Sequence, residues 1–119
     1  NIIESNNELL NWTVNQLLSL KNNNNLEKIV LVGAAFKENT DDLRNSPTLD
    51  IYKILDDMEV QVSILDTEIE VPNHSYVSSV EHVDSKSLIA IMYPLNDDLD
   101  KKLLDHSSQN DCIIFYPWR

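Results

Sequence analysis

The sequence predicts a three-layer, Rossmann-like α/β domain, in which a parallel sheet carries helices on both faces, preceded by one N-terminal helix. Three observations support this fold class. Short apolar runs without alternation recur along the chain, and such runs are typical of strands that a parallel sheet buries on both faces. Segments with apolar residues at helical spacing lie between the runs, so strands and helices alternate. The length of 119 residues suits one domain with a core of its own.

The N-terminal helix is expected over about residues 4–20, where the apolar residues fall at helical spacing: Leu10, Val14, Leu17 and Leu18. The four asparagines at 22–25 are polar and turn-prone, so they should end this helix and link it to the rest of the chain. We therefore divide the chain into residues 1–25, a helix with its linker, and residues 26–119, the α/β domain.

The α/β domain should open with a strand at 29–32, which Gly33 ends. A helix should start at Ser46 and Pro47, because serine can cap a helix and proline suits its first position. Its expected apolar residues are Leu49, Tyr52, Leu55 and Met58.

Three further strands are expected, at 60–65, 88–92 and 112–116, with a short additional strand near 76–80. Asp97 and Asp98 can cap a last helix, which carries Leu99, Leu103 and Leu104. Because consecutive strands are separated by helices or long connections, right-handed crossovers and a parallel sheet follow.

The composition excludes several classes of function. Nine lysines and arginines against twenty acidic residues leave a net charge of −11, which disfavours binding to nucleic acid or to an anionic membrane. The single cysteine, Cys112, cannot form an internal disulfide, so a cytoplasmic location is expected. The sequence shows neither a membrane-spanning apolar run nor the pattern of a signal peptide. With one glycine the chain cannot form a glycine-rich nucleotide loop.

The segment between the first strand and the next helix, residues 33–46, is the first place to expect a ligand, because parallel α/β sheets bind ligands at the carboxyl ends of their strands. It contains Lys37 and Arg44 in a chain with few cations, and the capped helix start after it favours an anion. The alternative is a solvated loop in which Arg44 pairs with Asp41 or Asp42.

This segment also matches a family pattern. From Gly33 to Pro47 it fits every fixed position of Gly-x-x-Phe-Lys-x-x-Thr-x-Asp-x-Arg-x-Ser-Pro. The pattern resembles the start of the C-terminal, UDP-binding domain of the UDP-glucose/GDP-mannose dehydrogenases. The N-terminal helix, with Asn11, Val14 and Leu18, is similar to the end of that family's central dimerisation helix. The Trp118-Arg119 ending is similar to the UDP-N-acetylmannosamine branch.

The resemblance implies part of an NAD-dependent nucleotide-sugar 6-dehydrogenase, which oxidises a UDP-sugar twice to a UDP-uronic acid. In that family a cysteine in another part of the protein forms the covalent intermediates, and an N-terminal Rossmann domain binds most of the NAD. The expected partners are a UDP-sugar, the N-terminal and central domains of the same protein, and a second copy in a homodimer. This chain should supply nucleotide-sugar contacts and no catalytic residue.

The resemblance also assigns roles to individual residues. Phe36 and Lys37 would lie against the UDP-sugar, with Lys37 as a cation near its phosphates or sugar. Arg44 would face the cleft between domains and could reach the NAD phosphates, with Asp42 orienting it. Arg119 loosely matches an arginine that contacts the substrate of a neighbouring subunit, and the alternative is a terminal arginine without a role.

Other candidate residues have ordinary structural interpretations. Asp66, at the end of the second strand, is placed like a ribose-binding acid or a strand-end cap. Cys112 lies in an apolar run and is expected to be buried and structural. Ser46 is expected to cap its helix. No metal site is expected. Asp97, Asp98 and Asp100 should cap a helix. The histidines lack metal-ligand spacing and are expected in solvated loops: His74, His82 and His106.

Two other classes of function share features with this chain. A phospho-receiver domain has a similar length and acidity, but it needs acidic residues after its first strand, where this chain has Gly33-Ala34-Ala35, and a lysine after its last, where it has Pro117-Trp118. A free-standing nucleotide-binding module without catalysis remains open. It differs from the enzyme only in whether more chain, with a glycine fingerprint and a cysteine loop, belongs to the same protein.

Overall fold

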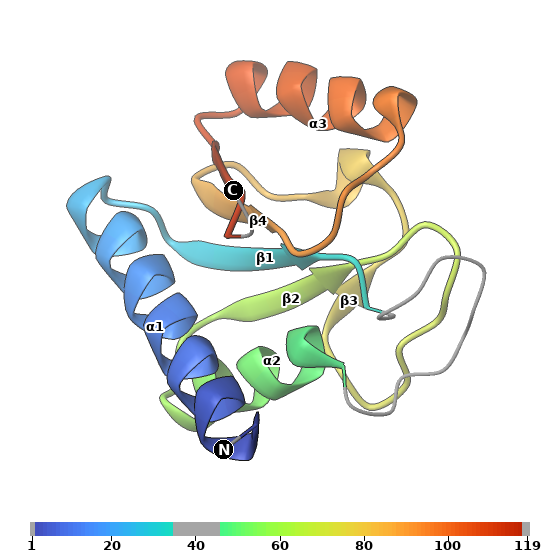
Figure 1. Cartoon of the computed structure of the whole chain (residues 1–119). Coiled ribbons are helices and arrows are strands. Elements are labelled where there is room, and N and C mark those ends of the chain that lie inside the picture. The colour runs from blue at the N-terminus through green and yellow to red at the C-terminus, as the bar shows by residue number, and fades with distance from the viewer. Residues whose placement is uncertain (1, 35–45, 118–119) are drawn as a thin grey trace.

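The computed structural model describes residues 2–34 and 46–117, with side chains from residue 8 onward. In chain order the elements are α1 (Ile2–Asn23), β1 (Lys28–Val32), α2 (Pro47–Asp57), β2 (Val62–Leu65), β3 (Tyr76–Val77), the short 3₁₀ helix η1 (Val80–His82), β4 (Ser87–Ile91), α3 (Asp97–Gln109) and β5 (Ile113–Phe115). The strands form one sheet in the order β3-β2-β1-β4-β5, and every pair is parallel. The predicted α/β class is confirmed (Figure 1).

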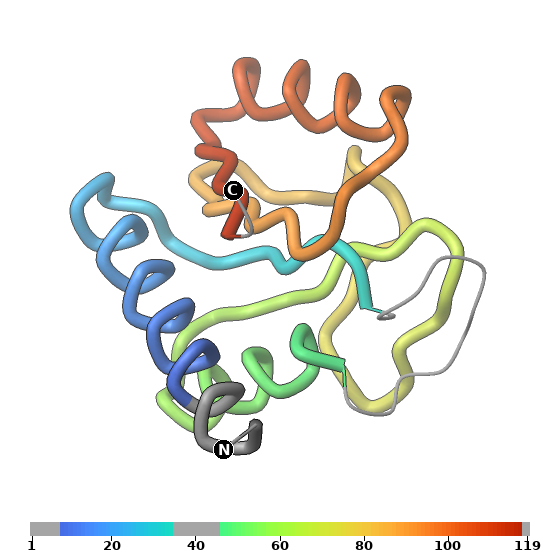
Figure 2. The backbone as a smooth tube through the Cα atoms, in the orientation of Figure 1, coloured from blue at the N-terminus to red at the C-terminus, as the bar shows by residue number. Residues whose placement is uncertain are grey.

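Helices cover both faces of this sheet. On one face, α1 and α2 lie side by side, and Val14, Leu17 and Leu55 pack against β1, β2 and β4. On the other face, Leu103 of α3 and the segment around η1 pack against Val30 of β1 and Ile89 of β4. The two helical layers are separated by the sheet in Figures 1 and 2. Because both faces are covered, the central strands are apolar without alternation, as the sequence indicated.

α1 extends past the predicted end at residue 20 and includes the first two asparagines of the 22–25 run. The turn follows at Asn24 and Asn25, where Asn25 has a φ of 55° and the Asn24 side-chain amide donates to the carbonyl of Leu20. Asparagine tolerates this left-handed conformation and can satisfy carbonyls at a helix end. The helix therefore ends within the asparagine run, and Asn24 and Asn25 form the turn that follows it.

The two later helices start at polar caps. Ser46 is the N-cap of α2, its hydroxyl accepts from the Leu49 N–H, and Pro47 occupies the first turn, as predicted. The prediction for α3 was wrong by one residue, because Asn96, and neither Asp97 nor Asp98, is the N-cap. The Asn96 side-chain oxygen accepts from the N–H of Leu99 at 2.8 Å.

Several predicted boundaries shift. β2 starts at Val62, because the Val60 N–H is bonded back to Leu55 and Glu59 takes a φ of 62° to end α2. β3 is only two residues long, and the 80 position belongs to η1. β5 spans Ile113–Phe115 and is thus one residue shorter at each end than the predicted strand at 112–116. Met58 and Leu104, which the sequence placed among the apolar positions of their helices, are about half exposed.

Among the described residues, no helix is both long and apolar enough to cross a membrane.

Candidate functional site

The carboxyl edge of the sheet contains the point where the strand order reverses, between β1 and β4. β1 leads into Gly33 and β4 leads into Met92 and Tyr93, and the Met92 N–H donates to the carbonyl of Val32 at 3.0 Å. In open α/β sheets the connections that leave in opposite directions at such a point create the crevice where ligands bind. This edge is therefore the candidate site.

Gly33 has a backbone conformation that only glycine adopts without strain, with a φ of 100°. A Cβ atom built on it would lie 2.9 Å from Cδ2 of Tyr93. The Tyr93 ring thus packs directly on the backbone at the end of β1, so the ends of β1 and β4 are in contact at the switch point.

The backbone that follows β1 is held by side chains from two other elements. The carbonyl of Gly33 accepts from Oγ1 of Thr48 at 2.6 Å, and that of Ala34 accepts from Oγ of Ser46 at 2.5 Å. The N–H of Ala34 donates to Oδ2 of Asp66 at 3.0 Å. We call Ser46, Thr48 and Asp66 the anchor cluster. It joins the start of α2 and the end of β2 to the end of β1.

Asp66 also shapes the connection after β2. Its second carboxylate oxygen, Oδ1, accepts from the N–H groups of Glu68 and Ile69, each at 2.9 Å. The carboxylate therefore accepts three backbone N–H groups. Of the two roles left open by the sequence, the structural one is confirmed: Asp66 caps the strand end.

The proposed ligand-binding residues lie in a part of the chain that this structure does not describe. Phe36, Lys37, Asp42 and Arg44 belong to 35–45, and Arg119 belongs to 118–119. Their predicted roles stay predictions. The structure does describe both ends of 35–45, Ala34 and Ser46, which are hydrogen-bonded to each other at the candidate edge. Ala34 and Ser46 therefore lie together at the predicted edge of the sheet.

The N-terminus of α2 lies at this same edge, because its cap residue Ser46 is bonded to Ala34. A helix N-terminus carries a partial positive charge that favours anions such as phosphate. Asp50 in the first turn of α2 already places a negative side chain near this partial positive charge. The anchor cluster itself offers hydroxyls and one carboxylate, so a cation for a phosphate would have to come from elsewhere.

Cys112 is buried, as predicted, although it lies immediately before β5 and not within it. Its thiol points to the carbonyl oxygens of Asp84 and Asn110, with Sγ–O distances of 3.4 and 3.6 Å. Burial raises the pKa of the Cys112 thiol above its ordinary value. A thiol with a raised pKa is a poor nucleophile, which supports the predicted structural role of Cys112.

The three histidines belong to different parts of the fold. His74 packs edge-on against the Tyr52 ring, and His82 is in η1. The expectation of solvated loops was wrong for His106, which is on α3, partly buried, with Nε2 2.8 Å from the carbonyl of Val83. Within residues 2–34 and 46–117, no group of three or more histidine, cysteine or acidic side chains could hold a metal ion.

The acidic residues of α3 also have structural partners. Asp98 pairs with Lys102 one turn later at 3.4 Å, and Asp100 accepts from the Tyr116 hydroxyl at 2.8 Å. Together with Asn96 as the cap, these contacts replace the predicted capping roles of the aspartates.

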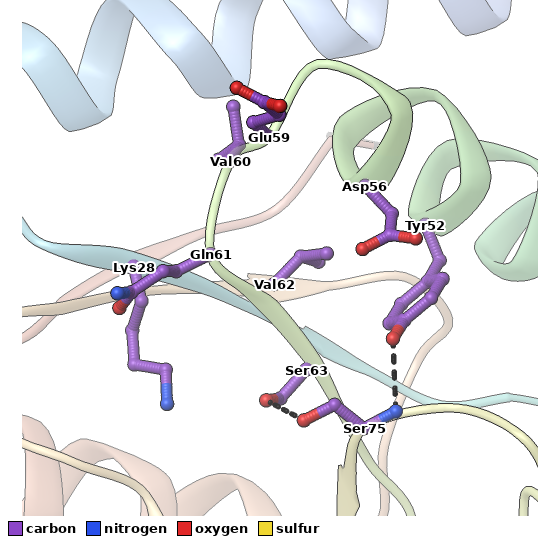
Figure 3. Close-up of a pocket in the computed structure, with 9 residues that line it drawn as sticks. All are labelled: Lys28, Tyr52, Asp56, Glu59, Val60, Gln61, Val62, Ser63 and Ser75. Carbon is purple, nitrogen blue, oxygen red and sulfur yellow. Dashed lines mark hydrogen bonds between the residues drawn. The ribbon is translucent and has the colours of Figure 1, made fainter.

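A groove of about 430 Å³ lies at the opposite, amino-terminal edge of the sheet (Figure 3). Its side chains bond mainly to one another or to neighbours: Ser63 Oγ to Ser75 Oγ at 2.7 Å, and the Ser75 N–H to the Tyr52 hydroxyl at 2.9 Å. Lys28, also on this groove, is paired with Asp84. Of the polar residues that line this groove, Lys28, Tyr52, Ser63 and Ser75 are thus already bonded to protein groups.

Thr48 and Tyr93 are functional candidates that the sequence reasoning missed. A signal for Thr48 exists, because it shares one face of α2 with Ile51 and Leu55, and all three are buried. A buried polar side chain on an otherwise apolar helix face needs a hydrogen-bond partner. For Tyr93 the useful signal is its place directly after a central strand.

Fold and edge together define a Rossmann-like α/β domain with its ligand edge at the β1–β4 switch point. A family model, described as the UDP binding domain of the UDP-glucose/GDP-mannose dehydrogenase family, matches residues 30–104. The chain belongs to this family. The match includes the end of β1, the anchor cluster and β4.

Relatives and a solved structure agree with the family. The GDP-mannose 6-dehydrogenases of Pseudomonas savastanoi pv. phaseolicola and Pseudomonas syringae pv. syringae are each 33% identical over 93 residues, covering 73% of this chain. The chain spans 18% of the length of these relatives. The UDP-N-acetyl-mannosamine dehydrogenase Cap5O from S. aureus has the same fold, with a TM-score of 0.68 and 20% identity over 93% of this chain and 30% of that one.

Proposed function

We propose that this chain is the C-terminal nucleotide-sugar-binding domain of an NAD-dependent nucleotide-sugar 6-dehydrogenase, which converts a UDP-sugar to a UDP-uronic acid. The observation that carries the proposal is the family match over residues 30–104, which contains the switch-point edge. The edge is where a sheet of this topology binds its ligand. The relatives named above are dehydrogenases of nucleotide sugars.

Within this proposal, Phe36 and Lys37 contact the nucleotide sugar, and Lys37 places a cation near its phosphates or sugar. Charge-assisted hydrogen bonds to phosphate are among the strong ones, which supports this role for a lysine. Arg44 reaches the NAD phosphates, and Arg119 contacts the nucleotide sugar of a neighbouring subunit. Lys37, Arg44 and Arg119 act by electrostatic positioning, Phe36 packs against the nucleotide sugar, and none of the four transfers a proton or forms a covalent bond.

NAD would accept the hydride in this reaction, but the described residues do not form a dinucleotide site. Such a site needs several glycines where the backbone meets the pyrophosphate, and this chain has one. The acid that would bind a ribose, Asp66, already accepts three backbone N–H groups. We therefore place most of the NAD site, and the catalytic cysteine, in other domains of a longer protein. That protein would be a cytoplasmic homodimer.

Binding to this chain tests the proposal. Isothermal titration calorimetry of the 119-residue chain with UDP should give saturable binding, with a Kd in the range of about 1 µM to 1 mM. Inorganic phosphate at the same concentrations serves as the control for binding of any anion. The relatives act on GDP-mannose, so GDP is titrated in parallel. Absence of saturation by both nucleotides up to about ten times the upper limit would contradict the proposal.

The second candidate, a free-standing nucleotide-binding module, gives the same binding result. It differs in the rest of the protein, since the curated relatives are much longer than this chain. Reading the coding sequence upstream of Asn1 decides between them. A Gly-x-Gly-x-x-Gly fingerprint and a cysteine loop there support the enzyme, and their absence from a complete reading frame supports the module.

A further inference from the structure

One peptide unit at the candidate edge is held from both sides. The carbonyl of Gly33 and the N–H of Ala34 belong to the same planar peptide group and point in opposite directions. Thr48 of α2 donates to the carbonyl at 2.6 Å, and Asp66 at the end of β2 accepts from the N–H at 3.0 Å. The peptide group therefore bridges two elements that lie on either side of it.

We propose that Thr48 and Asp66 are positioning residues for nucleotide binding: they fix the orientation of the Gly33–Ala34 peptide group and so the direction in which the chain leaves β1. The inference rests on the proposed function, because the residues proposed to contact the nucleotide sugar follow directly after Ala34. Neither side chain needs to touch the ligand.

Glycine makes such a hold necessary. Gly33 has a φ of 100°, and a glycine can rotate the peptide group that follows it at little cost because it lacks a Cβ. A rotated peptide group would exchange the positions of its carbonyl and N–H. It would then set a carbonyl oxygen against the Asp66 carboxylate, which has no proton to donate. Asp66 thus selects one orientation of the peptide group, and the bond from Thr48 stabilises that orientation.

Burial strengthens this selection. Thr48 is fully buried, so its hydroxyl cannot exchange the Gly33 carbonyl for water. A buried polar group that loses its partner carries the full cost of desolvation. The bond from Ala34 to Asp66 has a carboxylate acceptor, and hydrogen bonds to carboxylates are stronger than those between neutral groups.

Ser46 completes the arrangement from the other end of 35–45. Its hydroxyl donates to the carbonyl of Ala34 while also capping α2. The Ala34 residue is therefore tied to the start of α2 through its carbonyl as well as to Asp66 through its N–H.

Thr48 offers a clean pair of variants. Thr48→Val keeps the size of the side chain and removes the donor, whereas Thr48→Ser keeps the donor. In calorimetry of the 119-residue chain, well below the melting temperature, Thr48→Val should weaken UDP binding about tenfold, equivalent to about 1.4 kcal/mol. Thr48→Ser should stay within about twofold of the unaltered chain. Asp84→Asn, at the opposite edge, is the matched control and should bind UDP normally.

Asp66 is tested against the ribose role directly. UDP and 2′-deoxy-UDP are titrated into the unaltered chain and into Asp66→Ala. If Asp66 is a positioning residue, Asp66→Ala weakens the binding of both nucleotides by the same factor, about tenfold. If Asp66 instead binds the ribose 2′-hydroxyl, Asp66→Ala weakens the binding of UDP alone, and that result overturns the proposal. In the ligand-free chain, the Ala34 amide should exchange its hydrogen at least about tenfold faster in Asp66→Ala, because it loses its acceptor.

The outcomes separate the two proposals. If the unaltered chain binds neither UDP nor GDP, the proposed function fails and the positioning role fails with it. If the unaltered chain binds a nucleotide and folded Thr48→Val binds it equally well, only the positioning role is wrong. Equal losses in Thr48→Ser and Thr48→Val also overturn the positioning role, because the serine retains the donor. Should Asp66→Ala not fold, the Thr48 pair still decides.

Discussion

The ring of Tyr93 occupies the space into which a side chain on Gly33 would project. A Cβ on Gly33 would lie 2.9 Å from Cδ2 and 3.6 Å from Cε2 of that ring. The φ of 100° at Gly33 is also unfavourable for any residue with a Cβ. Two independent effects therefore reserve this position for glycine.

Gly33→Ala should destabilise the domain by roughly 2–4 kcal/mol, from backbone strain and from the contact with Tyr93. Urea unfolding followed by circular dichroism measures this change. The double variant with Tyr93→Leu separates the two effects, because it should relieve the contact and keep the strain. A loss below about 0.5 kcal/mol in Gly33→Ala would show that the edge adapts easily.

The ion pair between Lys28 and Asp84 should make stability depend on pH in the acidic range. The hydrogen bond from Lys28, at 2.8 Å, and its charge hold the pKa of Asp84 below its ordinary value of 3.8. The folded pKa is thus lower than the unfolded one. The stabilisation is complete above the ordinary value and is lost as the pH falls through the folded pKa.

This pair is exposed at Asp84, so its contribution should be small, under about 1 kcal/mol. Nuclear magnetic resonance titration of the Asp84 carboxyl is the direct measurement. In Lys28→Met the pKa should rise toward the ordinary value, whereas Lys53→Met on the exposed side of α2 should leave it unchanged. An identical Asp84 pKa in Lys28→Met and the unaltered chain would show that the pair does not form in solution.

Cys112 should be chemically inert in the folded chain. Its buried, largely protonated thiol should react with a disulfide reagent at pH 7 at least about tenfold more slowly than in the unfolded chain. Its folded pKa is raised, so this group should also lower stability as the pH rises above its ordinary value of 9.0, where the unfolded thiol ionises first.

Cys112→Ser should cost roughly 1–3 kcal/mol of stability, because it buries a more polar group, and should keep turnover in the complete enzyme. Reaction rates with the reagent in buffer and in urea, with the melting temperature of the variant, check both statements. A complete loss of turnover at unchanged stability would give Cys112 a catalytic role.

The 119-residue chain alone should have no dehydrogenase activity, because it lacks the glycine fingerprint and the cysteine loop that the reaction requires. The measurement is NADH absorbance with UDP-sugar and NAD⁺. The same preparation must first bind UDP by calorimetry, so that an inactive result does not reflect a misfolded chain. Steady NADH formation by the pure chain would refute this prediction.

Lys37→Ala should weaken UDP binding about tenfold or more, on the basis of a charge-assisted bond of about 1.5–3 kcal/mol. Lys53→Ala, which removes an exposed lysine from α2, is the matched control. In the complete enzyme, Arg44→Ala should raise the KM for NAD⁺ more than that for the nucleotide sugar. Unchanged UDP affinity in Lys37→Ala would remove the lysine from the site and leave the family assignment intact.

The fold could be predicted because burial on both sheet faces leaves a direct trace in the sequence. The runs at β1 and β4 are apolar without interruption, and Ser46 with Pro47 marks a helix start that the structure confirms. Element ends were harder. Asn96, Asp97 and Asp98 are three adjacent residues that can all cap a helix, and only the final backbone geometry selects Asn96.

The position of the site could also be predicted, because parallel strands place their carboxyl ends at one edge. The anchor cluster could not. The bond between Asp66 and Ala34 joins residues 32 positions apart, and no local pattern distinguishes it from a ribose contact. Thr48 was missed because a threonine in the first helical turn usually suggests only local capping, whereas here its hydroxyl reaches back to Gly33.

The central place of β1 has a consequence for the chain as it is synthesised. β1 pairs with β2 and with β4, yet both partners emerge later, and β4 begins only at Ser87. A nascent chain that stops short of β4 presents one side of Lys28–Val32, the most apolar strand segment of the N-terminal half, without a hydrogen-bonding neighbour. Unpaired apolar edges attract other strands. Incomplete chains should therefore be more prone to aggregation than the finished domain, in which the fourth strand covers that side.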